Sequence, residues 1–182
     1  MSKLRVERTL CYMLRHKPEE FGVELDNFGY ASIPSVCAAL EISEEQLRNI
    51  VAADEKRRYS IVEDYIRCNF GHSIPSIQIV DTGASIPSSL LHGTKLSNLE
   101  SIFKTGLRPG SRQSVHMTSE LAVAVQVGLR YAKTLDNLVI LEVDTAAMQA
   151  NNLAVRSTGT STYLAGAVPA KYISISPLNG TL

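Results

Sequence analysis

Arginine and histidine recur in several short segments of this sequence. Packing of a hydrophobic core does not require these residue types there. The segments are Arg15-His16-Lys17, Lys56-Arg57-Arg58-Tyr59, Gly71-His72-Ser73, His92-Gly93-Thr94 and the run from Arg112 to His116. Guanidinium groups stay charged near neutral pH, and their paired N–H donors match the oxygens of phosphate. Imidazole titrates near neutral pH and can take or give a proton. These residue types predict anion binding beside a group capable of acid–base chemistry.

Each segment also has a purely structural interpretation. Arg15 and His16 stand at the end of a predicted helix, where cations satisfy the last carbonyls and interact favourably with the helix dipole. The cations from Lys56 onward are typical of a solvated turn. His72 fits a staple between loops as well as it fits a ligand contact, and His92 fits a hydrogen-bonded histidine of the core. Taken singly, the segments leave the function open.

Composition narrows the class of protein. The chain has 182 residues, 18 Lys+Arg against 18 Asp+Glu, and 45% hydrophobic residues. This predicts one ordinary domain or two small lobes with a real core. A formal net charge of zero argues against binding duplex nucleic acid by phosphate neutralisation alone. An anionic partner must therefore be bound by a few well-placed arginines.

Location and assembly follow from what the sequence does not contain. No stretch approaches the roughly 20 apolar residues of a membrane span, and the start has no apolar signal core. We expect a cytoplasmic protein, or a nuclear one in a eukaryote, with no membrane partner. A monomer is the default expectation.

The cysteines and histidines do not predict a metal centre. Cys11, Cys37 and Cys68 match neither a zinc clamp nor a small disulfide scaffold, and the histidines are equally scattered. We expect reduced, mostly packed thiols and no metal. The sequence also lacks a G-x-G-x-x-G after a strand and a Walker loop, the two standard nucleotide-binding motifs.

The first half of the chain predicts helices followed by a hairpin. Apolar spacing predicts a helix from Val6 that Pro18 forces to end near Lys17. A second helix is expected near residues 34–40, and a third begins at Ser43, where Ser-Glu-Glu-Gln is a capping box. Residues 59–62 and 65–68 predict two strands of a β-hairpin. Three helices and a hairpin are typical of a winged-helix-like lobe.

The second half predicts a sheet-rich lobe. Ser97-Asn98-Leu99-Glu100 is expected to be another capping box, with Gly106 as a helix stop. Thr118 is expected to cap a helix that runs through Gly128. The expected strands are residues 90–91, 138–143 and, more weakly, 155 and 172–175.

The fold class predicted for the whole chain is α+β, in two lobes. Residues 1–78 form the helical lobe and residues 90–182 the β-rich lobe. Residues 79–89 form the linker, because residues 74–89 mix Pro, Gly and Ser with little periodicity.

Together, the motifs resemble the RNA 2′-phosphotransferase family, the tRNA 2′-phosphotransferases. They occur in that family's order and approximate spacing over nearly the whole chain: Arg-His-Lys-Pro at 15–18, Lys-Arg-Arg-Tyr at 56–59, Gly-His-Ser at 71–73, His-Gly-Thr at 92–94, Gly-Leu-Arg-Pro at 106–109 and Arg-Gln-Ser-Val-His-Met at 112–117. The resemblance implies a winged-helix-like lobe that binds RNA and a C-terminal lobe of the ADP-ribosyltransferase type that binds NAD⁺.

The resemblance also implies a reaction. An internal 2′-phosphate on RNA, such as that of spliced tRNA, attacks NAD⁺ and expels nicotinamide, giving an RNA 2′-phospho-ADP-ribose intermediate. A ribose hydroxyl then attacks the phosphorus, releasing RNA with a 2′-OH and ADP-ribose 1″,2″-cyclic phosphate. The implied catalytic residues are Arg15, His16, Arg58 and Arg112. The implied residues for the co-substrate NAD are His92, Gly93, Thr94, His116 and Thr118.

The residue types suit such a reaction. Three guanidinium forks match a phosphate dianion, hold it in line for attack and later offset charge in the transition state. Nicotinamide leaves as a neutral group, so no metal is needed. His16 can accept a proton from the ribose hydroxyl or only orient it, and both roles stay open.

Two other functions are compatible with the sequence. One is ADP-ribosyl transfer onto a nucleic-acid end phosphate or a protein, without the second step. The other is a winged-helix nucleic-acid-binding module without catalysis.

Overall fold

The computed structural model describes residues 3–181, with side chains from Arg5 onward. The chain divides into two compact units. The first contains the residues up to Val80 together with Ser111–Gln113, and the second contains Asp81–Gly110 together with the residues from Ser114 onward. Each unit combines helices with an antiparallel sheet, so the prediction of an α+β fold is confirmed.

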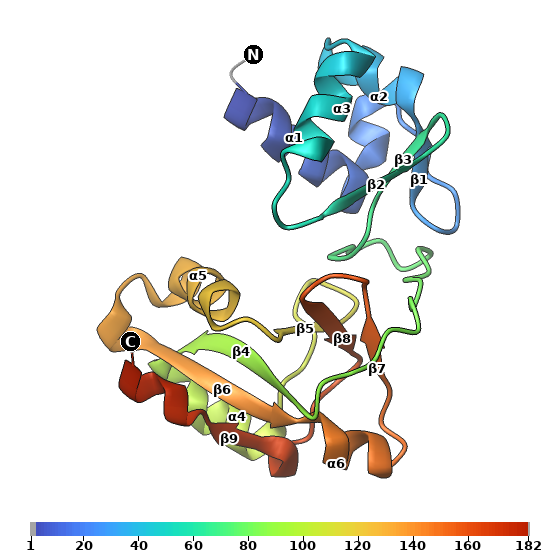
Figure 1. The fold of residues 1–182 in the computed structure, drawn as a ribbon. Helices are drawn as coiled ribbons and strands as arrows, with labels where there is room; N and C mark the ends of the chain where they lie inside the picture. Colours follow the sequence, from blue (N-terminus) through green and yellow to red (C-terminus); the bar gives the residue numbers. More distant parts are fainter. Residues whose placement is uncertain (1–2, 182) are drawn as a thin grey trace. The chain divides into compact units, whose positions relative to one another are not determined.

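The first unit packs three helices against a small sheet of strand order β1-β3-β2 (Figure 1). Its elements are α1 (Lys3–Arg15), the 3₁₀ turn η1 (Pro18–Phe21), β1 (Tyr30–Ser32), α2 (Ile33–Leu40), α3 (Glu44–Ala52), β2 (Tyr59–Val62) and β3 (Tyr65–Cys68). The predicted capping box is present, because the Ser43 side chain accepts the Gln46 N–H and the Gln46 side chain accepts the Ser43 N–H. The hairpin of β2 and β3 occupies the predicted residues.

Apolar side chains fix the C-terminal end of α1 against the sheet. Met13 and Leu14 are fully buried in one core with Leu47 of α3 and Ile66 of β3. Burying each such side chain contributes about 1.5–3 kcal/mol to folding. The last turn of α1, which carries Arg15, is therefore held in place by the two buried side chains that directly precede Arg15.

The second unit is built on a six-stranded antiparallel sheet of strand order β7-β8-β5-β4-β6-β9 (Figure 1). Its main elements are β4 (Ser89–Lys95), α4 (Leu99–Thr105), β5 (Val115–Thr118), α5 (Leu121–Ala132), β6 (Leu138–Asp144), α6 (Thr145–Ala150), β7 (Val155–Ser157), β8 (Thr162–Ala165) and β9 (Ile173–Ile175). Short 3₁₀ turns are η2 (Leu96–Asn98), η3 (Leu135–Asn137), η4 (Ala170–Tyr172) and η5 (Pro177–Thr181).

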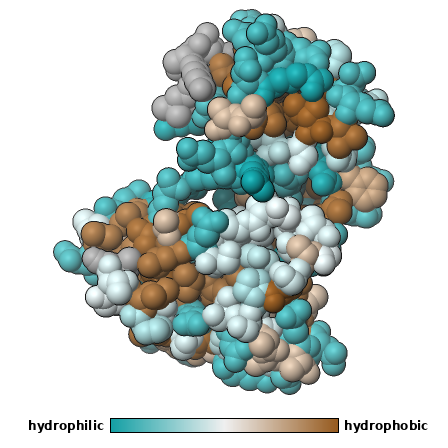
Figure 2. Space-filling view, in the orientation of Figure 1, coloured by the Kyte–Doolittle hydropathy of each residue, from teal (hydrophilic) through white to brown (hydrophobic). Residues whose placement is uncertain are grey.

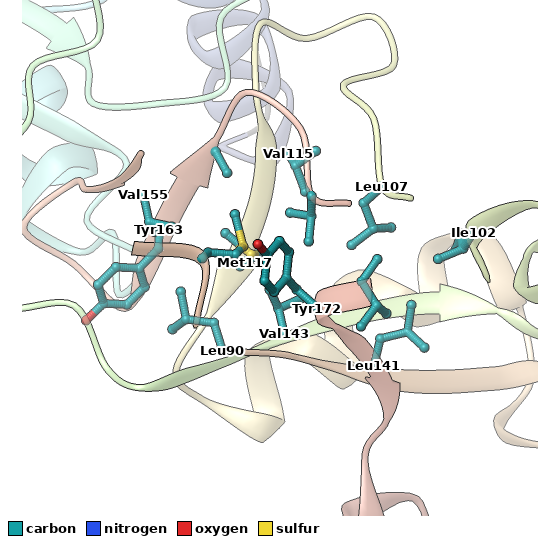
Figure 3. Packing of buried hydrophobic residues seen from close by; sticks show 14 of the residues in the cluster. Leu90, Ile102, Leu107, Val115, Met117, Leu141, Val143, Val155, Tyr163 and Tyr172 are labelled. Carbon is teal, nitrogen blue, oxygen red and sulfur yellow. The ribbon is translucent and has the colours of Figure 1, made fainter. Parts of the chain in front are cut away.

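Helices cover both faces of this sheet. On one face, Leu90, Val115 and Met117 pack with side chains of β6, α4 and α6 (Figure 3). On the other face, α5 packs on Leu91, Leu138 and Ile140. The alternation along each strand therefore decides which helix layer a side chain meets.

Two predicted helix caps are wrong. Thr118 ends β5 and its hydroxyl accepts the Glu120 N–H, while α5 begins at Leu121 with Glu120 as its N-cap and extends past Gly128. Ser97 lies inside η2, and α4 begins after Asn98 with no side-chain cap hydrogen bond. In both places a short turn between strand and helix displaces the cap that the local motif predicted. Gly106 does end α4, with φ 81°.

Residues of the predicted linker contact the second unit. The Thr82 N–H donates to the Ser157 carbonyl at 3.1 Å, and the Asp81 carboxylate accepts the Ser157 N–H at 3.3 Å. No helix within residues 3–181 is long and apolar enough to cross a membrane. The space-filling view shows apolar and polar areas on the visible face of each unit (Figure 2).

Candidate active site

Arg15 is the last residue of α1 and carries a buried guanidinium. The residue is only 7% exposed, and its Cζ lies 5.3 Å from the centre of the Phe70 ring. A Cβ on Gly71, whose φ is +91°, would lie 3.1 Å from that Cζ, so glycine lets the backbone pass close to the charge. The Nε and Nη2 atoms have no hydrogen-bond partner within the described residues. Buried charge of this kind is costly unless it is paired, so the position fits a bound anion.

Arg58 is oriented by a carboxylate. Asp54 Oδ1 accepts from both Nε and Nη2 of Arg58, at 2.8 and 2.7 Å, and the Asp54 side chain is only 4% exposed. Asp54 Oδ2 also accepts the backbone N–H of Arg58. Arg57, in the left-handed region at φ 46°, completes the turn that brings the two residues together. The edge of the Arg58 guanidinium formed by Nε and Nη2 is fixed by this carboxylate.

Two thiols and a phenol surround these arginines. We define the thiol–arginine cluster as Cys11, Arg15, Arg58, Tyr59 and Cys68. The charges of Arg15 and Arg58 both act to lower the pKa of the Cys11 thiol. Cys68 lies opposite Tyr59 in the β2–β3 ladder, and the ring of Tyr59 lies 5.4 Å from Arg58 Cζ. Arg15 and Arg58, 43 positions apart in sequence, thus share one neighbourhood.

His16 is held by a serine of another segment. Its Nδ1 lies 2.9 Å from Ser73 Oγ, and the Ser73 N–H donates to the Arg15 carbonyl at 3.0 Å. Partial burial lowers the pKa of His16, and the charges of Arg15 and Arg112 lower it further. The ring is therefore neutral at pH 7, and its orientation is set through Nδ1.

Arg112 belongs to the first unit although it follows β4 and α4 in sequence. The backbone N–H of Gln113 donates to the His72 carbonyl at 3.2 Å, and the Gln113 side chain donates to the carbonyls of Ile74 and Ile77. These bonds hold residues 111–113 against the segment that follows β3. Arg112 is thereby close enough to His16 to influence its pKa.

His72 is a buried histidine. The residue is 2% exposed, its Nε2 donates to the Cys68 carbonyl at 2.9 Å, and a Cβ on Gly29 would lie 3.1 Å from the ring. Burial lowers the pKa of His72. These contacts join the loop before β1, the end of β3 and residues 111–113, which favours the staple interpretation over a ligand contact.

The five predicted NAD-binding residues lie in the second unit, on β4 and β5. Within the described residues, one backbone pair joins these strands, Leu91 with Thr118. At the next residue of β4, the strands are joined by a side chain: His92 Nδ1 donates to the His116 carbonyl at 2.9 Å. Burial lowers the pKa of His92, so this ring is neutral. A side chain thus bridges the strands where a ladder hydrogen bond would otherwise stand.

Strand alternation divides these residues between the faces of the sheet. His92 and Thr94 share the face of Leu90, whereas Gly93 turns toward α5. A Cβ on Gly93 would lie 2.1 Å from the Ala124 carbonyl oxygen and 3.0 Å from Gly128 Cα. Helix packing therefore accounts for this glycine.

Two threonine hydroxyls near the strand junction accept hydrogen bonds from neighbouring groups. Thr94 Oγ1 accepts from Asn98 at 3.2 Å, and Thr118 Oγ1 accepts the Glu120 N–H at 3.1 Å. A hydroxyl that accepts keeps its own proton to donate. Neutral imidazole and threonine O–H groups are chemically compatible with ribose and pyrophosphate oxygens.

The predicted site residues are divided between the two units. Arg15, His16, Arg58 and Arg112 all lie in the first unit, and His92, Gly93, Thr94, His116 and Thr118 all lie in the second. Sequence reasoning missed Asp54 and Ser73 as partners of Arg58 and His16. The four-residue spacing from Asp54 to Arg58 was a usable signal, because acidic and basic side chains often pair at that spacing. Within the described residues, no three His, Cys, Asp or Glu side chains gather to hold a metal ion.

The first unit therefore holds a buried arginine whose Nε and Nη2 have no hydrogen-bond partner within the described residues, and the chain is an α+β protein with a candidate anion site. The family model described as "RNA 2'-phosphotransferase, Tpt1 / KptA family" matches residues 1–166. The chain belongs to this family of RNA 2′-phosphotransferases.

Curated relatives agree with the family assignment. A protein of Thermococcus kodakarensis is 34% identical over 177 residues, covering 94% of this chain and 96% of the relative. Proteins of Burkholderia lata and Agrobacterium fabrum are each 36% identical, covering 93% and 92% of this chain and 89% and 91% of the relatives. All three are named "Probable RNA 2'-phosphotransferase".

Proposed function

We propose that this protein removes an internal 2′-phosphate from RNA by transferring it to NAD⁺, with RNA 2′-OH, nicotinamide and ADP-ribose 1″,2″-cyclic phosphate as products. The observation that carries the proposal is Arg15, whose buried Nε and Nη2 have no partner within the described residues. A phosphate monoester offers a dianion with equivalent oxygens, which suits two parallel N–H donors. Family membership makes RNA 2′-phosphate the anion to test first.

The first unit supplies the groups that would hold and position the phosphate. Arg15 offers the partnerless edge of its guanidinium, and Arg58 is oriented by Asp54 so that its remaining donor is directed. The charge of Arg112 acts on His16. Fixed donors aimed at one dianion favour in-line attack, and they offset charge at phosphorus in the second step.

His16 would act on the ribose hydroxyl in the second step. Its lowered pKa keeps the ring neutral at pH 7. If Nδ1–H donates to Ser73 Oγ, the Nε2 lone pair is left to accept the hydroxyl proton. Loss of His16 is then expected to let the RNA 2′-phospho-ADP-ribose intermediate accumulate.

NAD⁺, when bound, would supply an electrophilic ribose carbon with a neutral leaving group. The residues proposed to hold it are His92, Thr94, His116 and Thr118 of β4 and β5, while Gly93 supports the strand through its contact with α5. Thr94 and Thr118 keep hydroxyl protons to donate, and the His92 ring is fixed by the His116 carbonyl.

The test is direct. A 2′-phosphorylated oligoribonucleotide is incubated with the protein and NAD⁺ in the presence of EDTA, and the products are separated by chromatography. We expect dephosphorylated RNA and ADP-ribose cyclic phosphate, both dependent on NAD⁺. An ADP-ribose group that persists on RNA would instead indicate simple ADP-ribosyl transfer, and unchanged RNA would overturn the proposal.

A further inference from the structure

Asn69 follows β3 and is bonded to the turn that carries Arg58. Its backbone N–H donates to the Arg58 carbonyl at 2.8 Å, one residue beyond the last pair of the β2–β3 ladder, Tyr59 with Cys68. Its side-chain Nδ2 donates to the Arg57 carbonyl at 2.9 Å. These two carbonyls belong to the peptide groups before and after the Arg58 Cα. One residue therefore holds the main chain on both sides of this arginine.

The amide of Asn69 is itself held in one orientation. The Ser60 hydroxyl donates to Asn69 Oδ1 at 2.8 Å, and this leaves Nδ2 as the end that meets the Arg57 carbonyl. An asparagine side chain supplies an acceptor and a donor at the same branch point, whereas an ionised aspartate of the same size supplies acceptors only. The position therefore needs asparagine for its hydrogen bonds and not only for its size.

The turn before β2 depends on such support. Arg57 lies in the left-handed region at φ 46°, which is unfavourable for a residue with a Cβ. The Arg57 N–H donates to the Asp54 carbonyl at 2.8 Å, and the Asp54 carboxylate holds the Arg58 guanidinium. Asp54, after α3, thus fixes the side chain of Arg58, and Asn69, after β3, holds its main chain.

The residues that follow Asn69 contact the end of α1. The centre of the Phe70 ring lies 5.3 Å from Arg15 Cζ. The Ser73 N–H donates to the Arg15 carbonyl at 3.0 Å. The short segment from Asn69 to Ser73 therefore contacts both arginines, and its placement sets where Arg58 lies relative to Arg15.

We propose that Asn69 is a positioning residue for the phosphate transfer, because it fixes the main chain of Arg58 relative to Arg15. The inference rests on the proposed function, in which both guanidinium groups bind one phosphate. Asn69 is not a catalytic residue, since its N–H, Nδ2 and Oδ1 are all bonded to protein groups of the hairpin and its turn. A small displacement of a guanidinium weakens most the contacts that form as charge develops in the transition state. Loss of Asn69 should therefore lower kcat and leave KM for NAD⁺ almost unchanged.

Steady-state kinetics of the full-length protein with 2′-phosphorylated RNA and NAD⁺ test this role. We expect Asn69→Ala to lower kcat by about tenfold and to leave KM for NAD⁺ within about twofold, because the residues proposed to bind NAD⁺ lie in the second unit. Asn69→Asp keeps the size and the acceptor for Ser60, but it loses the donor to Arg57 and should be no more active than Asn69→Ala. Asn137→Ala is the matched control, because Asn137 bonds Thr134 in an exposed turn of the second unit, and its kcat should equal the wild-type value.

A double variant separates positioning from a general structural role. In the Arg58→Ala background, Asn69→Ala should lower the single-turnover rate by less than about twofold, since the arginine that it positions is absent. Equal losses in the wild-type and Arg58→Ala backgrounds would overturn the proposal. A wild-type kcat in Asn69→Ala would overturn it as well.

The side chain of Arg58 provides a readout that does not need activity. Its Nε–H donates to Asp54 Oδ1 at 2.8 Å, and its ¹H–¹⁵N cross-peak is assigned by its loss in Arg58→Lys. We expect Asn69→Ala to shift or broaden this cross-peak and Asn137→Ala to leave it in place. An unchanged cross-peak in Asn69→Ala would contradict the positioning role. A displaced cross-peak, combined with a wild-type protein that does not turn over 2′-phosphorylated RNA, would overturn the proposed function, while the placement of Arg58 by Asn69 would stand.

Discussion

Ser73 Oγ lies 2.9 Å from His16 Nδ1, and the backbone of Ser73 is bonded to the carbonyl of Arg15. A residue that follows β3 thus fixes both the ring at the end of α1 and the chain that carries it. In the proposed reaction, Nε2 is then the ring nitrogen of His16 that acts on the ribose hydroxyl, because Nδ1 is engaged by the serine.

Removing this hydrogen bond is expected to slow turnover moderately. A hydrogen bond of this type contributes about 1 kcal/mol, which corresponds to about a fivefold loss of kcat in Ser73→Ala. Ser73→Thr keeps the hydroxyl and should recover most of the loss. Steady-state kinetics with a 2′-phosphorylated oligonucleotide measure both variants. Equal rates for Ser73→Ala and the wild type would show that the serine does not orient His16.

Asp54 is expected to act through Arg58. Asp54→Ala frees the guanidinium to rotate, and we expect kcat to fall by about tenfold or more, as for loss of a bond to a charged group. The double variant with Arg58→Ala should be little worse than Arg58→Ala alone, since the carboxylate then has nothing to position. Urea unfolding separates this effect from a loss of stability. Additive losses in the double variant would contradict a positioning role.

Arg58 and Arg112 are expected to be essential for rapid turnover. Arg58→Ala or Arg112→Ala should reduce kcat by about a hundredfold or more, as removal of a transition-state contact does. Arg130→Ala provides a matched control, because Arg130 is exposed on α5, and its rate should be unchanged. Near-normal turnover in Arg112→Ala would place the phosphate elsewhere.

The rate should fall on the acid side at an unusually low pH. Burial and two arginines lower the pKa of His16, so the neutral ring persists below the pH at which an ordinary histidine is protonated. Activity that needs the neutral ring is present above that pKa and is lost as the pH falls through it. A pH profile of single-turnover product formation measures this. Arg112→Lys retains the charge and should leave the midpoint low, whereas a wild-type midpoint above 6.5 would exclude His16 as the titrating group.

Gly93 is expected to be required for folding of the second unit. A Cβ at this position would collide with the backbone of α5, so Gly93→Ala should destabilise by about 1–3 kcal/mol or more. Gly166→Ala is the control, since a Cβ there meets nothing within 4 Å. The urea midpoint of each variant checks this. Equal midpoints would show that α5 adjusts without cost.

Local motifs predicted those elements whose partners are close in sequence. The capping box at Ser43 and the β2–β3 hairpin need only neighbouring residues, and both are present. The same kind of motif failed at Ser97, because a 3₁₀ turn and the bond from Asn98 to Thr94 decide where α4 begins.

The composition of the site depends on contacts that no local pattern contains. Ser73 meets His16, and Gln113 meets Ile74 and Ile77, through the tertiary fold. The family resemblance predicted which arginines belong to the site. The residues that surround these arginines could be identified only from the structure. The contact of Gly93 with Gly128 likewise depends on how α5 lies on β4, which periodicity does not reveal.

Residues 111–113 complete the first unit from a distant stretch of the polypeptide. A fragment that stops at Val80 would therefore lack Arg112. It would also lack the hydrogen bonds from Gln113 to the Ile74 and Ile77 carbonyls. A cut after Val80 would separate residues 111–113 from the segment that they bind. The polypeptide enters the second unit, returns to the first at residues 111–113 and then enters the second again.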